Sequence, residues 1–165
     1  MFKKIPLLML FSLVAVLPAV ADEFSLLNEE KLGDFKMGLS ETDLKKKVSC
    51  PLKREEEQLW GADGIYHQVW HYPACGLSFS MSSVQKSGSK SVDGITVTAP
   101  SVLKTKRGIH IGSSQQAVMK AYGHDKAADA ESNKQMFVAG SIYGGLVFTF
   151  KQHKVTSIFL GAGAE

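Results

Sequence analysis

The sequence predicts an α+β protein made of two tandem copies of a helix followed by a three- or four-stranded antiparallel sheet, with the helices on one sheet face. Two observations favour this class. Apolar residues alternate with small or hydroxyl residues along several short segments, which is typical of a sheet covered on one side only. Three sequence blocks also recur in the same order, which indicates an internal repeat. The predicted organisation is a first repeat over 22–98, a linker over 99–107 and a second repeat over 108–165.

The N-terminus has the pattern of a bacterial secretory signal peptide over residues 1–21. Lys3 and Lys4 precede an apolar run, and the small residues at 19–21 suit a cleavage site. The apolar run is short for a membrane-spanning helix, and no cysteine at the cleavage site encodes a lipid anchor. We therefore expect a periplasmic or secreted protein with no membrane anchor.

The chain that remains after cleavage is nearly neutral. Without Lys3 and Lys4 it holds 17 basic and 16 acidic residues, a net charge of +1. It has no basic tract of the kind that binds nucleic acid, and we interpret the lysine run at 45–47 as a solvated helix face. Nucleic-acid binding is therefore not expected.

The two cysteines, Cys50 and Cys75, are predicted to form a disulfide, because this is the usual state of a cysteine pair in an exported protein. Such a bond closes a loop of about 25 residues and stabilises the fold by about 3 kcal/mol in the chain-entropy model. The alternative is a redox-active or nucleophilic thiol, but the sequence has no C-x-x-C motif.

The repeat consists of three aligned blocks. Residues 35–51 align with 109–125, 75–81 with 144–150, and 92–97 with 155–160. The successive offsets are 74, 69 and 63 residues, so the first copy has the longer loops. Each first block ends an extended segment at apolar-x-apolar-Gly-x-Ser, where a helix is expected to begin.

The two helix starts have predicted caps. Ser40 can accept a hydrogen bond from a first-turn amide, and Asp43 suits the positive end of the helix. In the second copy Ser113 with Gln116 matches a capping box, and Ser114 is the alternative cap. We interpret these Gly-x-Ser turns as scaffold, with anion binding at the second helix start as the alternative.

The strands are predicted from alternation. Strands are expected at 68–72, 77–82, 92–98, 134–140, 146–150 and 155–160. The segment 150–157 has the pattern of a hairpin, and 82–94 has the composition of a longer version of the same turn.

The densest group of unusual residues is "LWGADGIYHQVWHY", residues 59–72. If Ile65 and Val69 face the helices, an aromatic row lies on the open face of the sheet, beside a floor of serines. Aromatic residues there would be good anchors for a protein partner. The alternative register places Trp70 in the core. The candidate partner-binding residues are Trp60, Tyr66, Gln68, Trp70, Tyr72, Ser78 and Ser80.

Patterns for metal binding and catalysis are weak. His67 and His71 would lie about 13 Å apart in a strand, too far to share one ion unless the chain bends. The S-x-x-K matches at 83–86 and 101–104 fall in loop-like sequence, and "AGSIYGG" departs from the G-x-S-x-G motif. We expect no metal, no cofactor and no enzymatic activity.

With these motifs in place, the chain resembles two related groups of bacterial proteins. The order extended–Gly–x–Ser–helix, followed by "GLVFTFKQHKVTSIFL", resembles SmpA/OmlA-type small envelope domains. Its tandem form resembles the β-lactamase inhibitory protein family, which implies an exported protein whose concave sheet face binds an enzyme. The chain departs from the first group in lacking a lipid-anchor cysteine. It departs from the second in having one disulfide, because His124 and Gly144 stand where the second copy would hold cysteines.

The resulting expectation is an exported binding protein that inhibits or neutralises a protein partner, either an exported hydrolase or a toxin. An accessory role in envelope assembly or structure is the alternative, and an enzyme or ligand carrier is a third possibility. Fold resemblance alone does not identify a target.

Overall fold

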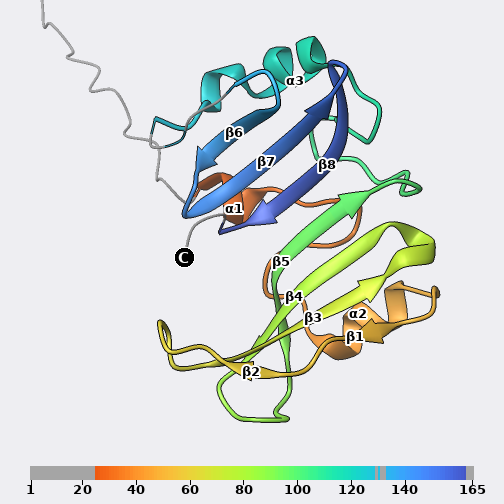
Figure 1. Ribbon diagram of the computed structural model, residues 1–165, viewed down its shortest axis with the longest axis vertical. Helices are drawn as coiled ribbons and strands as arrows, with labels where there is room; N and C mark the ends of the chain where they lie inside the picture. Colours follow the sequence, from red (N-terminus) through yellow and green to blue (C-terminus); the bar gives the residue numbers. More distant parts are fainter. Residues whose placement is uncertain (1–24, 129, 131–132, 163–165) are drawn as a thin grey trace, which may run out of the picture.

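The protein is described from a computed structural model, which covers residues 25–128, 130 and 133–162 in describable detail. The expected signal peptide, residues 1–21, lies outside the described residues. The described chain combines short helices with one large antiparallel sheet (Figure 1). The predicted α+β class is confirmed.

The described elements alternate in the order that the repeat predicts, with one additional helix at the start. The helical segments are α1 (Ser25–Glu29), α2 (Glu41–Lys47), η1 (Pro73–Cys75), α3 (Gln115–Tyr122) and η2 (Gly123–Asp125). The strands are β1 (Lys53–Arg54), β2 (Gln58–Leu59), β3 (Tyr66–Tyr72), β4 (Leu77–Ser83), β5 (Ser91–Thr98), β6 (Met136–Ser141), β7 (Gly144–Lys151) and β8 (Lys154–Gly161).

The strands form one eight-stranded sheet in the order β1-β3-β4-β5-β8-β7-β6, with β2 also paired to β3. Its centre is the antiparallel pair β5–β8, in which Thr96 lies opposite Phe159 and Val97 opposite Ile158. This pair joins the meander β3–β4–β5 to the meander β6–β7–β8, as Figure 1 shows. We call α2 with β3–β5 the first half and α3 with β6–β8 the second half.

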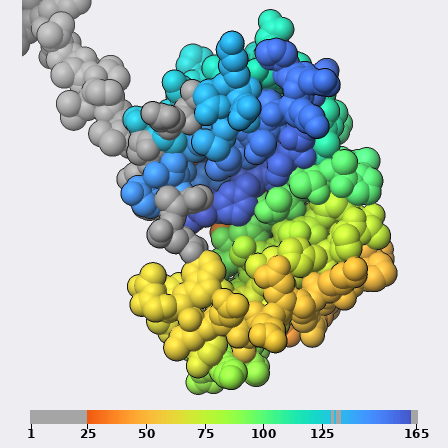
Figure 2. All heavy atoms as spheres, viewed as in Figure 1, coloured from red at the N-terminus to blue at the C-terminus, as the bar shows by residue number. Residues whose placement is uncertain are grey.

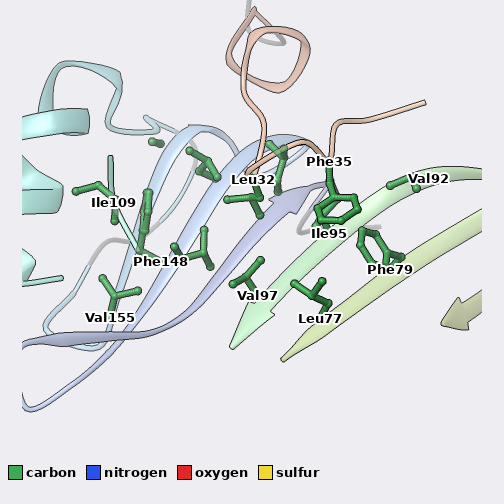
Figure 3. Close-up of a cluster of buried hydrophobic side chains, with 14 of the residues drawn as sticks. Leu32, Phe35, Leu77, Phe79, Val92, Ile95, Val97, Ile109, Phe148 and Val155 are labelled. Carbon is green, nitrogen blue, oxygen red and sulfur yellow. The ribbon is translucent and has the colours of Figure 1, made fainter. Parts of the chain in front are cut away.

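One face of the sheet holds the hydrophobic core (Figure 3). Phe79 and Phe148 lie on this face, and both are fully buried. Phe35, which precedes α2, packs edge-on against Phe79 with ring centres 5.2 Å apart. Tyr122 of α3 packs against Phe148 at the same distance, 5.2 Å. Aromatic contacts therefore connect the segments around both helices to one continuous apolar face.

The two long helices begin with equivalent caps. Ser40 accepts a hydrogen bond from the amide of Asp43, and Ser114 accepts one from the amide of Ala117, each at 3.1 Å. Ser113 instead accepts a hydrogen bond from the amide of His110 at 3.0 Å, so the predicted capping box is wrong and the alternative cap is the one that forms. The hydroxyl of Ser113 stabilises the turn before the helix.

Each cap is also bound to the last strand of its own half. Gly38 donates to the carbonyl of Val92 at 2.7 Å, and Gly112 donates to that of Val155 at 2.8 Å. Both glycines have a positive φ, +74° and +89°, which favours glycine at these turns. These equivalent bonds join residues that the aligned blocks pair, while descent of the two halves by duplication stays a prediction.

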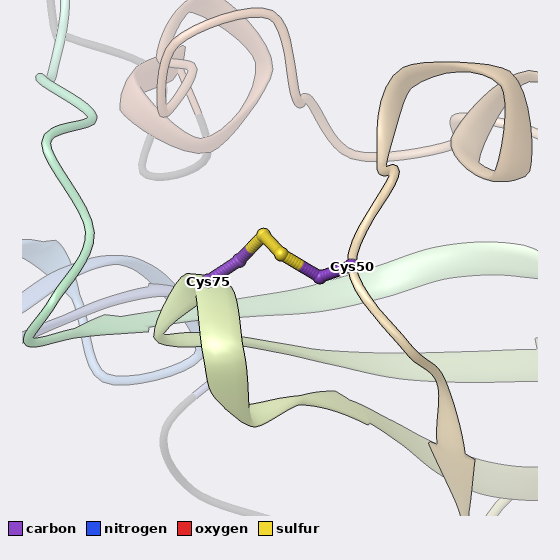
Figure 4. Close-up of a disulfide and its surroundings, with 2 residues drawn as sticks. All are labelled: Cys50 and Cys75. Carbon is purple, nitrogen blue, oxygen red and sulfur yellow. A yellow bond between two sulfur atoms is a disulfide. The ribbon is translucent and has the colours of Figure 1, made fainter.

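Cys50 and Cys75 form the predicted disulfide (Figure 4). Their Cα atoms are 6.1 Å apart, and 25 residues separate them in the sequence. Cys50 follows α2, and Cys75 ends η1, immediately before β4. The bond therefore fixes the end of a helix to the start of a central strand in the first half.

Candidate functional site

β3 presents its last aromatic residues to the core. Trp70 and Tyr72 are each 2% exposed, and they lie opposite Phe79 and Leu77 of β4. The expected placement of these two aromatic residues on the open face is therefore wrong. Alternation separates a strand into two sets of residues, but it does not state which set faces inward. Here the larger aromatic set buries more apolar area than Val69 and its neighbours on the other set would.

Gln68 and Tyr66 share the core side of β3 with Trp70, so the whole predicted row lies on that side. The indole Nε1–H of Trp70 donates to Gln68 Oε1 at 2.7 Å, and Gln68 Nε2 donates to the carbonyl of Glu55 at 2.8 Å. The guanidinium of Arg54 lies 4.5 Å from the centre of the Trp70 ring. Trp70 is thus a covered residue whose polar atom has a partner within the chain.

A polar cleft of about 380 Å³ opens beside Trp70. Within it Lys90 Nζ and Glu57 Oε1 form an ion pair of 2.5 Å, and their side chains are 7% and 11% exposed. The amide of Ser87 also donates to Glu57 at 2.7 Å. The hydrogen bond from Lys90, followed by that from Ser87, lowers the pKa of Glu57. Glu57 therefore fixes the segment before β3 to the turn between β4 and β5.

The opposite side of the sheet, which we call the open face, carries small hydroxyl residues. Ser78 and Ser80 lie there, half-buried, where the sequence places them. The open face of β3, β4, β5 and β8 is formed by His67, Val69, His71, Ser78, Ser80, Ser82, Thr96, Ser157 and Phe159. This face has a flat floor because most of its side chains are short.

Phe159 is the aromatic residue of the central seam on this face, and it was missed from the sequence. Its ring lies across two glycines: a Cβ atom on Gly94 would lie 3.2 Å from it, and one on Gly161 would lie 2.6 Å from it. The same added Cβ on Gly94 would lie 3.1 Å from Ser80. The signal in the sequence is an aromatic residue at a position where the alternation expects a small one, two residues before Gly161.

A projecting segment of residues 55–64, which we call the arm, borders the open face (yellow, lower left, Figure 2). Its tip is a hairpin in which the amide of Trp60 donates to Ile65 O at 3.0 Å and the amide of Gly64 donates to Trp60 O at 2.9 Å. Leu59, in this hairpin, is 58% exposed. Trp60 is half-buried because its ring stacks on His67, with ring centres 3.9 Å apart.

His67 connects the arm to the sheet through two carboxylates. Its Nε2 lies 2.7 Å from Asp63 of the arm, and its Nδ1 lies 3.2 Å from Asp93 of β5. The amide of Ile65 is the main cause that lowers the pKa of Asp63. Burial is the main cause that raises the pKa of Asp93, and the hydroxyl of Ser82 opposes it. The two carboxylates therefore differ in their tendency to hold a proton.

His71 provides a second connection to the arm. Its Nδ1 lies 2.9 Å from Ser78 Oγ, and its Nε2 lies 2.7 Å from Glu55 Oε1. The sequence of serine, histidine and carboxylate invites comparison with a catalytic triad. However, β4 is paired on both edges, so the amides around Ser78 serve the sheet instead of an oxyanion. We interpret His71 as a strap that holds Glu55.

Two further findings concern ligand classes. Among the described residues, no group of three or more histidine, cysteine or acidic side chains is arranged to hold a metal ion. No helix in the described part of the chain has the length and apolar composition needed to cross a membrane.

The chain matches no family model, and neither a curated protein nor a solved structure matches it. Any function must therefore be argued from the sequence and from the geometry above.

Proposed function

We propose that this protein is an exported binding protein that inhibits or neutralises a protein partner, and that the open face and the arm contact that partner. The observation that carries this proposal is the flat hydroxyl floor with Phe159 at its centre and a projecting arm at its border. Flat surfaces with a few aromatic anchors are well suited to protein recognition. Leu59 and Trp60 replace Trp70 and Tyr72 as the candidate anchors.

Several other features support the proposal. The disulfide is typical of proteins that fold in an oxidising compartment, which agrees with an export signal in residues 1–21. The equivalent caps and strand contacts of the two halves support a tandem repeat with the helices on one face of the sheet. A tandem repeat of this kind is the basis of the resemblance to the β-lactamase inhibitory protein family. The partner would then be an exported hydrolase or a toxin.

The second candidate is an accessory protein of envelope assembly, and one experiment separates the two. Tagged protein is used to capture partners from periplasmic extract, and the partners are identified by mass spectrometry. A binding protein of the proposed kind captures one soluble hydrolase or toxin in a stoichiometric complex. Recovery of outer-membrane assembly components alone would overturn the proposal.

Two matched variants locate the surface in the same experiment. Leu59→Ser changes an exposed arm residue, and Val102→Ser changes a residue that is 84% exposed and lines a groove beside Phe35 and Leu103 instead. We expect Leu59→Ser to weaken capture and Val102→Ser to leave it unchanged. Equal capture by both variants would exclude the arm as the contact surface. Thermal unfolding of each variant verifies that the fold is retained.

A further inference from the structure

His67 faces more hydrogen-bond acceptors than a neutral imidazole can satisfy. Both of its ring nitrogens lie within hydrogen-bond distance of carboxylate oxygens, at 2.7 Å to Asp63 and 3.2 Å to Asp93. A neutral imidazole has one N–H donor and one acceptor nitrogen, while an ionised carboxylate only accepts. The contact geometry therefore requires one additional proton, either on His67 or on Asp93.

The groups around His67 make this proton important for the arm. Asp63 approaches from the arm, Asp93 from β5 and the hydroxyl of Ser82 from β4. Glu55 and Glu56 line the same small cavity as His67, and the imidazole provides the only cationic form among its lining side chains. The ring itself is 8% exposed, beneath Trp60. Loss of the proton leaves a nitrogen lone pair against a carboxylate in a poorly solvated position.

We propose that His67, Asp63 and Asp93 form a proton-controlled latch that holds the tip of the arm on the sheet. When the cluster holds its additional proton, two charge-assisted hydrogen bonds join the arm to β5 through the imidazole. When the proton leaves, one of these bonds becomes a repulsion, and the Trp60 stack opens. Because Leu59 and Trp60 belong to the proposed contact surface, the latch would also regulate partner binding, and this last step rests on the proposed function.

The latch is tested in the free protein by collisional quenching of tryptophan fluorescence with acrylamide. Trp70 is 2% exposed, so quenching reports mainly on Trp60, and a Trp60→Phe variant provides the background. We expect the quenching constant of Trp60 to increase about twofold or more between about pH 5 and about pH 9, the range in which histidine charge changes. Near-ultraviolet circular dichroism at both pH values verifies that the core is unchanged. A quenching constant that does not change with pH would overturn the latch.

Three variants assign the effect to individual groups. His67→Gln keeps one donor and one acceptor but does not titrate, so its quenching should not depend on pH. Asp93→Asn can donate to a neutral His67, so its arm should stay shielded across the whole range. His71→Gln is the matched control, because His71 also holds an arm carboxylate but lies outside the cluster; it should keep the transition. A transition that persists in Asp93→Asn or disappears in His71→Gln would contradict the assignment.

Partner binding is measured separately, so the two proposals can fail independently. With a captured partner, affinity of the wild-type protein should change with pH in parallel with the quenching, and affinity of Asp93→Asn should not. A quenching transition without any change in affinity would retain the latch and exclude its regulatory role.

Discussion

The two halves of the sheet use the same backbone contacts to support different additions. In both halves a glycine with positive φ, a serine cap and a bond to the last strand start the helix. The first half adds the disulfide, the arm and its two histidine connections. The turn between β7 and β8 in the second half consists of Gln152 and His153 alone. The comparison teaches that the shared residues build the scaffold, and that candidate functional residues lie among those that only one half has.

A second difference lies beneath the sheet and ties the halves together. α1 precedes the first half in the sequence but contacts β6 and β7 of the second. Glu30, which follows α1, is 3% exposed and accepts a hydrogen bond from the hydroxyl of Tyr122 at 2.9 Å. Its other oxygen accepts one from the amide of Lys106 at 3.1 Å. The corresponding helix position in the first half is Val48, which has no polar group. The halves therefore resemble each other but are not separable units.

The largest expected effect comes from truncating the equivalent core residues Phe79 and Phe148. Both are fully buried, so Phe79→Ala and Phe148→Ala should each lower the free energy of unfolding by about 3–5 kcal/mol. Because β5 and β8 join the halves, each variant should unfold in one transition, measured by denaturant titration with circular dichroism and fluorescence. Two separate transitions in either variant would show that the halves are independent units.

Removal of the disulfide should have the next largest effect. The double variant Cys50→Ser, Cys75→Ser should lose about 3 kcal/mol of stability, because the bond closes a loop of about 25 residues in the unfolded chain. Hydrogen exchange measures where the loss occurs. Amides of α2 and β4, next to the bond, should exchange faster at low denaturant than those of α3 and β7. Equal acceleration in both halves would instead indicate that the bond acts only on global unfolding.

Much of the fold could be predicted from the sequence, since it depends on local signals. Alternation predicts the antiparallel meanders, and the paired Gly-x-Ser turns predict the helix starts. The face of Trp70 could not be predicted, because a shift of one residue exchanges the two faces of a strand without changing the pattern. α1 has only five residues, too few for a clear helical period, and its position depends on contacts with distant strands.

The candidate site was less predictable for a similar reason. Ser78, Ser80 and the segment around Trp60 were identified because they are unusual in composition. The role of His67 depends on Asp93, which lies 26 positions later and reaches it only through the pairing of β3, β4 and β5. No local pattern relates these residues. Phe159 has the same origin, because the glycines beneath it come from two different strands.

Tyr122→Phe tests the connection between α1 and the second half, with an intermediate expected effect. Loss of its hydroxyl removes a donor from the buried carboxylate of Glu30, so stability should fall by about 1–3 kcal/mol. Tyr72→Phe is the matched control, because Tyr72 is equally buried but its hydroxyl makes no hydrogen bond among the described residues. A loss of similar size in both variants would indicate that the Glu30 bond contributes little.

The same residue predicts a dependence on alkaline pH. Burial raises the pKa of Tyr122 above that of an unfolded tyrosine, so the folded state retains the proton more strongly. The folded state then binds more protons than the unfolded state above about pH 10, and stability decreases as the pH rises. Tyr122→Phe should reduce this slope, measured by thermal unfolding between about pH 9 and about pH 11. A slope equal to that of the wild-type protein would assign the alkaline loss to other groups.

The smallest expected effect, and the most direct comparison of the halves, comes from the helix caps. Ser40→Ala and Ser114→Ala should each lower the free energy of unfolding by about 1 kcal/mol, because each leaves one first-turn amide without its acceptor. In contrast, Ser113→Ala should leave the helix itself unaffected, since its hydroxyl serves the preceding turn. Circular dichroism and urea titration distinguish these outcomes. Equal losses for Ser40→Ala and Ser114→Ala would support two copies of one scaffold, whereas a loss confined to one half would mean that surrounding contacts determine what each cap contributes.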